Sequence, residues 1–67
     1  MPTARITEIS ASSTESFDDA VAQGLKRANK KLRNVTSAWI KDQEVACKNG
    51  KISEYRVKMK VTFILKD

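Results

Sequence analysis

A chain of 67 residues has room for one domain and not for a second, so we expect residues 1–67 to form a single domain. Its one cysteine, Cys47, excludes an internal disulfide, and with no histidine the chain has no set of ligands typical of a zinc site. The formal net charge of +5 suits an anionic partner without identifying it. Because a core this small is marginal alone, self-association is the remaining means of stabilisation.

Targeting and catalytic signals are absent from the sequence. The N-terminus reads M-P-T-A-R, and no apolar run approaches the roughly 20 residues that cross a bilayer, so we expect no membrane partner. The unpaired cysteine favours a cytoplasmic location. There is no nucleophile beside a base, no glycine-rich phosphate loop and no metal-binding cluster. We therefore expect no catalytic residue, no metal site and no enzymatic activity.

The first predicted element is a short strand over residues 4–10, A-R-I-T-E-I-S. Ile6 and Ile9 fall on opposite faces under strict alternation, which indicates a bulge or a strand buried partly on both sides. Ser12 and Glu15 then have the spacing of a capping box, which predicts the start of a helix.

The helix is predicted by apolar residues that recur at three- and four-residue steps, the period of one helical face. These residues are Phe17, Ala20, Val21, Gly24, Leu25, Ala28 and Leu32. Glycine costs about 1 kcal/mol relative to alanine inside a helix. We therefore expect Gly24 to permit the close approach of a strand.

After Asn34 the apolar period changes to two, which predicts strands. The Asn-Gly pair in K-N-G-K (48–51) is the strongest short-range signal for a type I′ hairpin. A hairpin centred there gives these pairs: Lys48 with Lys51, Gln43 with Arg56, Trp39 with Lys60, Ser37 with Thr62, Ala38 with Val61, and Ile40 with Met59. In this register Trp39 stands on the face away from the helix, near Lys58 and Lys60.

The same register places Asp42 and Glu44 on the helix side of the sheet. A hairpin tip that extends past the helix would leave both acids in water, and a bulge near Gln43 is the rival explanation. The predicted fold class is α+β, in the order β-α-β-β, with three antiparallel strands packed on one face against a single helix. The other face is uncovered, and in so short a chain its cover must come from other copies.

With these elements the sequence resembles the dodecins, small flavin-binding proteins of bacteria and archaea. The resemblance rests on S-S-T-E-S-F at the helix entry, K-K-L-R-N after the helix, and S-E-Y-R-V-K-M-K-V-T-F-I-L in the closing strand. It implies a cytoplasmic, hollow homododecamer that binds riboflavin, FMN or FAD at subunit contacts and stores it without turnover. Some members of the family also resemble coenzyme A binders.

The resemblance has two departures at the expected ligand site. The family's flavin-stacking tryptophan falls at Ser37 here, and Trp39 follows two residues later on the same face, roughly 7 Å along the strand. The family's flavin-contacting glutamine, which follows a tyrosine, falls at Arg56 after Tyr55. A cation in place of a neutral amide favours a ligand that carries phosphate.

The candidate binding residues are Ser37, Trp39, Gln43, Arg56, Lys58 and Lys60. Trp39 is either a stacking platform or a contact between subunits, and the three basic residues are either a phosphate-binding stripe or a charged face that pairs across subunits with Asp42, Glu44 or Glu54. The leading hypothesis is storage of a flavin nucleotide, with Trp39 contacting the ring and Arg56 and Lys58 contacting its phosphate. The alternatives are a binder of coenzyme A or another nucleotide, and a structural or polyanion-binding assembly. The basic cluster K-R-A-N-K-K-L-R lacks interleaved aromatic residues, so a nucleic-acid partner is not expected.

Overall fold

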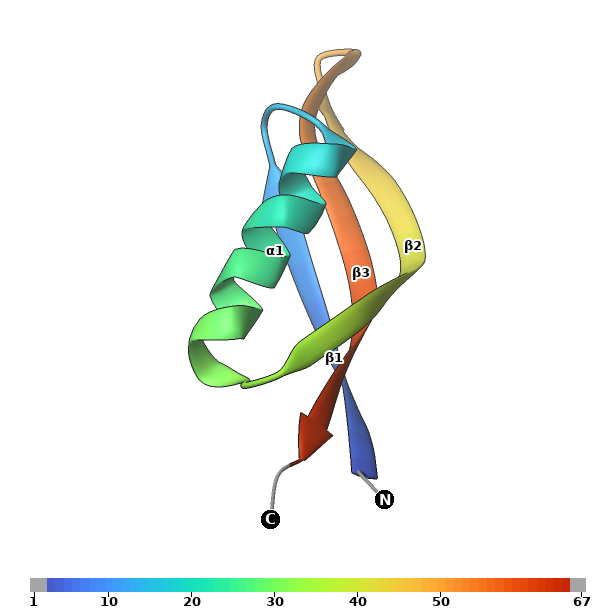
Figure 1. The fold of residues 1–67 in the computed structure, drawn as a ribbon. Helices are drawn as coiled ribbons and strands as arrows, with labels where there is room; N and C mark the ends of the chain where they lie inside the picture. The colour runs from blue at the N-terminus through green and yellow to red at the C-terminus, as the bar shows by residue number, and fades with distance from the viewer. Residues whose placement is uncertain (1–2, 66–67) are drawn as a thin grey trace.

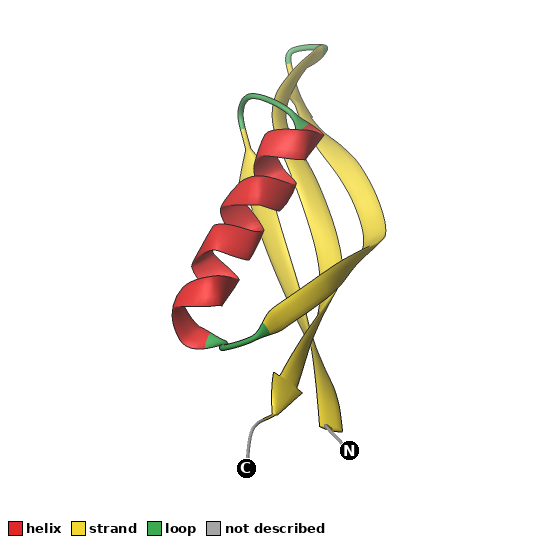
Figure 2. Ribbon diagram, in the orientation of Figure 1, coloured by secondary structure: helices red, strands yellow, loops and turns green. Residues whose placement is uncertain are grey.

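The computed structural model describes residues 3–65 and contains four elements in the predicted order. They are β1 (Thr3–Ser13), α1 (Phe17–Lys31), β2 (Val35–Lys48) and β3 (Lys51–Leu65). The strands form one antiparallel sheet of order β1-β3-β2, and α1 lies against one of its faces (Figures 1 and 2). This arrangement confirms the predicted β-α-β-β fold. Within residues 3–65, no helix is long and apolar enough to cross a membrane.

The helix begins later than the predicted capping box. Ser16 is the N-cap, and its hydroxyl accepts a hydrogen bond from the backbone N–H of Asp19 at 2.9 Å. Ser12 lies within β1, so the predicted pairing of Ser12 with Glu15 is wrong. The backbone N–H of Glu15 donates instead to the hydroxyl of Ser13, at 2.9 Å. The serine-rich segment offers several competing caps, and the extension of β1 removes the first of them.

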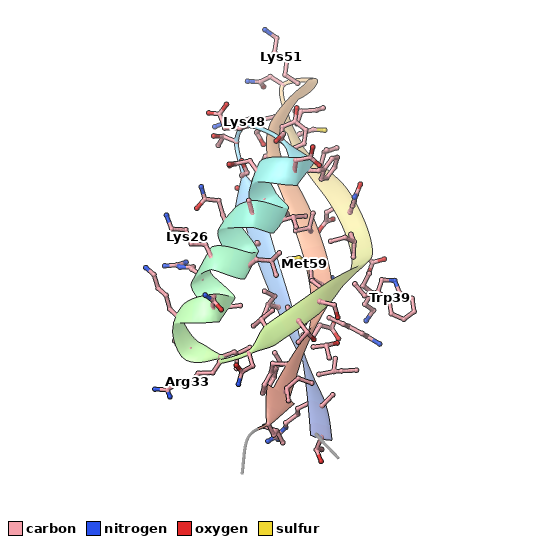
Figure 3. The ribbon with its side chains drawn as sticks, in the orientation of Figure 1. Lys26, Arg33, Trp39, Lys48, Lys51 and Met59 are labelled. Atoms are coloured by element: carbon pink, nitrogen blue, oxygen red, sulfur yellow. The ribbon has the colours of Figure 1, made fainter. Side chains whose placement is uncertain are left out.

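The apolar stripe of α1 covers the central strand. Val57, Met59 and Val61 of β3 are completely buried and pack with Ala20 of the helix. Figure 3 shows Met59 between α1 and the sheet. The prediction for Gly24 is confirmed by its surroundings. A Cβ atom at this position would lie 2.6 Å from Cε of Met59 and 2.9 Å from Cβ of Ala11 in β1. Only a residue without a side chain lets the helix lie this close to the sheet.

β1 pairs with β3 over its full length without a shift in register. The bulge proposed for this strand is therefore absent. Ile9 pairs with Met59 and packs against the core, whereas Ile6 pairs with Thr62 on the opposite face and is 62% exposed. The two isoleucines serve different faces of the sheet, and the outer one is left without cover in the single chain.

The hairpin turn is confirmed. Asn49 and Gly50 both have positive φ, 53° and 76°, as a type I′ turn requires. The predicted pairs of Trp39 with Lys60, of Ser37 with Thr62, of Ala38 with Val61, of Ile40 with Met59 and of Lys48 with Lys51 are also present. The register is thus as predicted at the hairpin tip and from Ser37 to Ile40, whereas a shift between Val35 and Ser37 changes it at the start of β2.

The middle of the hairpin differs from the prediction. The register shifts between Ile40 and Asp42, which makes Lys41 an extra residue, and β2 bends sharply about midway along its length (Figure 1). Gln43 consequently pairs with Val57, so the predicted pair of Gln43 with Arg56 is wrong. A bulge adds one residue to one strand and so reverses the facing of every residue after it.

Because of the bulge, two acids lie on the other side of the sheet from the one predicted. Asp42 pairs with Lys58 and Glu44 pairs with Arg56, so both lie on the face away from α1 rather than on the helix side. The hairpin tip does extend past the start of the helix, as Figure 1 shows. The bulge, however, is what removes these carboxylates from the helix side. Another shift, between Ala46 and Cys47, restores the predicted register at the tip.

Candidate functional site

The sheet face opposite α1, which we call the open face, carries the predicted site. Its residues form rows across the three strands, because directly paired residues point to the same side of a sheet. From the hairpin tip downward the rows are Glu44–Arg56–Ser12, Asp42–Lys58–Ser10, Trp39–Lys60–Glu8 and Ser37–Thr62–Ile6. Charged residues therefore occupy three of the four rows.

Trp39 is the large aromatic group of this face. Its side chain is 73% exposed and points away from both the sheet and α1 (Figure 3). Lys60 is its direct partner on β3, and Glu8 lies beyond Lys60 on β1. An indole displayed in this way offers a flat apolar surface to an aromatic ring, and such stacking is worth about 1–3 kcal/mol for a base.

Toward the hairpin tip, the cations of the open face meet acids of the same chain. Nε of Arg56 donates to Oε1 of Glu54 at 2.6 Å. This hydrogen bond, together with the charge of Glu54, raises the pKa of the Arg56 guanidinium above its ordinary value. Glu44 pairs with Arg56 across the strands, and Asp42 pairs with Lys58. The predicted phosphate stripe is thus balanced by carboxylates within one chain, and not only by those of a neighbouring subunit.

A second ion pair crosses the face beside Trp39. Nζ of Lys41, the bulge residue, lies 3.2 Å from Oε1 of Glu8, so its side chain reaches across β3 to the far strand. Both side chains are about half exposed, and such pairs contribute about 0–1 kcal/mol. This ion pair therefore adds little to the free energy of unfolding. It does change the charge balance of the face, because Glu8, the acid opposite Lys60, is already paired with Lys41.

The structure brings together some of the predicted residues and separates others. Ser37, Trp39 and Lys60 lie in adjacent rows, while Lys58 and Arg56 lie nearer the tip. Gln43 has the parity of the helix side, yet it is exposed and lines a shallow hollow of about 500 Å³. The other residues that line this hollow are Ser10, Ala11, Ser12, Asp42, Glu44, Glu54, Arg56, Val57 and Lys58. Among residues 3–65, no cluster of three or more acids or cysteines could hold a metal ion.

Sequence reasoning missed two residues of this face, Glu8 and Lys41. Glu8 shares the parity of Ile6, so its position followed from the alternation of β1 alone. Lys41 had no such signal, because its contact depends on the bulge that releases it from pairing. The pairing of Glu54 with Arg56 was readable, since residues two apart in a strand share a face.

Comparison with known proteins identifies relatives over nearly the whole chain. The profile of the dodecin family matches residues 3–66. The dodecin from Streptomyces davaonensis superimposes with a TM-score of 0.95 at 32% sequence identity, covering 98% of this chain and 97% of that chain. A variant of the Thermus thermophilus dodecin gives a TM-score of 0.95 at 25% identity and covers 100% of both chains.

A third structural relative is reported to bind a metal ion. The calcium-chelating antigen calcium dodecin, from Mycobacterium tuberculosis, superimposes with a TM-score of 0.83 at 28% identity, covering 96% of this chain and 91% of that chain. Comparison with curated protein sequences gave no significant match.

Proposed function

Because this chain belongs to the dodecin family, we propose that it binds a flavin without chemical turnover and so stores or buffers that cofactor. The observation that carries the proposal is Trp39, whose side chain is 73% exposed on a sheet face that no other part of residues 3–65 covers. A ligand or a partner that covers this side chain would remove its apolar surface from water, which is favourable. The isoalloxazine ring of a flavin has the flat apolar face that stacks on an indole.

The proposed ligand contacts are arranged around that tryptophan. The flavin ring lies on Trp39, with Ser37 in the neighbouring row. The remaining contacts are Gln43, Arg56, Lys58 and Lys60. The protein acts as a binding protein rather than an enzyme, because these groups can hold a ligand but include no nucleophile with a base beside it.

The proposal includes assembly from copies of the same chain, as a hollow homododecamer in the cytoplasm. Ile6 and Trp39 are exposed on the open face, and α1 covers the opposite one. A second copy laid on the open face would bury both side chains and would close the ligand between two subunits. The flavin site is then an interface site, so Trp39 serves both assembly and binding.

The test is a titration of the purified protein with FMN, followed by the fluorescence of Trp39 at low and high salt. The chain contains one tryptophan, so the signal reports on a single position. We expect saturable quenching that survives salt, because stacking is not screened by ions. Unchanged emission, after correction for absorption by FMN, would refute a ring next to Trp39. Equilibrium dialysis of the same samples gives the stoichiometry independently.

The alternative at the open face is coenzyme A or another phosphate-bearing nucleotide. Binding of such a ligand depends on unpaired cations more strongly than flavin stacking does. Arg56 and Lys58 both lie beside carboxylates, which makes this alternative less favourable. A distinct observation favours a polyanion at another place. Four exposed basic residues of α1 line a hollow against β1: Lys26, Arg27, Lys30 and Lys31. Polyanion binding there would weaken steeply with salt and show no fixed stoichiometry, which separates it from flavin binding.

A further inference from the structure

The charges of the open face form two groups along the strands. The group nearer the hairpin tip contains three acids and two cations: Asp42, Glu44, Glu54, Arg56 and Lys58. Beside Trp39 the balance is reversed, because Lys41 and Lys60 share one acid, Glu8. An anion that approaches this face is therefore repelled near the tip and attracted near the tryptophan.

Lys60 differs from every other basic residue that the structure describes. All the others are exposed, whereas Lys60 is half-buried, between Trp39 on one strand and Glu8 on the other. Glu8 is the acceptor of Lys41, and within residues 3–65 Lys60 has no ion pair of its own. A partly buried ammonium group loses hydration, and a second anion beside it would compensate for that loss.

From this geometry we infer that Lys60 binds the phosphate of a flavin mononucleotide whose ring lies on Trp39. The inference rests on the proposed flavin binding and specifies its ligand class, an aromatic ring that carries a phosphate on a flexible arm. Arg56 and Lys58 are poorer phosphate ligands, because three carboxylates surround these two cations, whereas the one carboxylate opposite Lys60 is already paired with Lys41. The cation that matters is thus the one in the same row as the tryptophan.

The experiment compares FMN with riboflavin, which lacks the phosphate, by equilibrium dialysis on the full chain in its native assembly. A charge-assisted hydrogen bond to phosphate should give a preference for FMN of about ten-fold. Lys60→Gln should abolish this preference, and an unchanged circular dichroism spectrum and sedimentation profile show that the variant is folded and assembled. Lys51→Gln is the matched control, because it removes an exposed lysine of the same strand outside the proposed site, and it should keep the preference.

The possible results distinguish the role of Lys60 from flavin binding itself. Equal affinity for FMN and riboflavin in the wild-type protein, or an equal loss of preference in both variants, would overturn the role of Lys60 while flavin binding stands. Binding of neither ligand would overturn the proposed function and this inference together. A preference that falls only in Lys60→Gln is the expected result.

Discussion

The absence of a side chain at Gly24 determines how closely α1 packs against the sheet. The helix contacts the sheet at this residue, where a Cβ atom would lie nearest to Met59 and Ala11. The end of the Met59 side chain is flexible and can move. Cβ of Ala11 is fixed to the backbone of β1, so it cannot move without shifting the strand.

We expect Gly24→Ala to lower the free energy of unfolding by about 1–2 kcal/mol, since overpacking costs up to about 3 kcal/mol and alanine adds roughly 1 kcal/mol in helix propensity. Thermal unfolding at a fixed protomer concentration measures this. Gln23→Ala, at the exposed neighbouring position, is the control and should be neutral or slightly stabilising. A higher melting temperature for Gly24→Ala would contradict the close contact.

The site was partly predictable at this same scale. The facing of Trp39 was predicted by counting along a regular hairpin, because the two register shifts between the turn and its pair with Lys60 cancel. The partner of Gln43 could not be obtained in that way, since Gln43 lies between the shift at Ala46 and Cys47 and the bulge at Lys41. The ion pair of Lys41 with Glu8 required both the bulge and the register of β1, and neither is encoded in a short-range motif.

The elements themselves were predicted better than their ends. The helix and the hairpin were predicted correctly because the apolar stripe of α1 and the Asn-Gly turn are short-range sequence patterns. The start of the helix was misplaced because Ser12, Ser13 and Ser16 all have the chemistry of a cap. Which serine is used depends on where β1 stops pairing with β3, and that is a tertiary property.

The two capping assignments make different predictions for single substitutions. Ser16→Ala should destabilise the protein by about 1 kcal/mol, because it leaves the N–H of Asp19 without its acceptor. Ser12→Ala removes an exposed hydroxyl from β1 and should have almost no effect. Chemical denaturation of both variants gives the comparison. An equal loss in Ser12→Ala would restore the capping box as the start of the helix.

The bulge in β2 can be tested by two deletions of equal size. Deletion of Lys41 keeps the pairs of Asp42 with Lys58 and of Gln43 with Val57 in a regular strand. Deletion of Gln43 instead brings Lys41 opposite Lys58 and turns Asp42 toward the helix side. Cross-strand pairs contribute about 0.2–1 kcal/mol each, so we expect the Gln43 deletion to be less stable by about 1 kcal/mol. Equal melting temperatures would show that β2 has no preferred position for its extra residue.

At the scale of the whole molecule, residues 3–65 cover the sheet on one face only. The chain is elongated, with principal extents of 51 × 19 × 13 Å, so the open face is a large part of the surface of the chain. Its apolar groups, Ile6 and Trp39, lie in adjacent rows, and charged rows flank them toward the hairpin tip. An apolar area with a charged border is the usual composition of a surface that binds a second protein.

We expect the wild-type protein to sediment as a multiple of its 7.5 kDa chain, and Ile6→Lys to shift it toward smaller species. The lysine would place an unpaired charge where two open faces meet. Ala22→Lys introduces the same charge at an exposed position of α1 and serves as the control. A wild-type chain that sediments as a monomer would contradict assembly through the open face.

The order of the strands has a consequence for how the chain acquires its shape. β3 is central in the sheet but follows both of its neighbours in the sequence. Until residues 51–65 have been synthesised, β1 and β2 have no strand to pair with, and α1 has no buried surface to cover. The hairpin of β2 and β3 joins neighbouring segments, whereas β1 must pair Thr3 with Leu65 across nearly the full chain. Local pairing is the faster of the two, so the nascent chain stays open until its final strand appears, and β1 closes the sheet last.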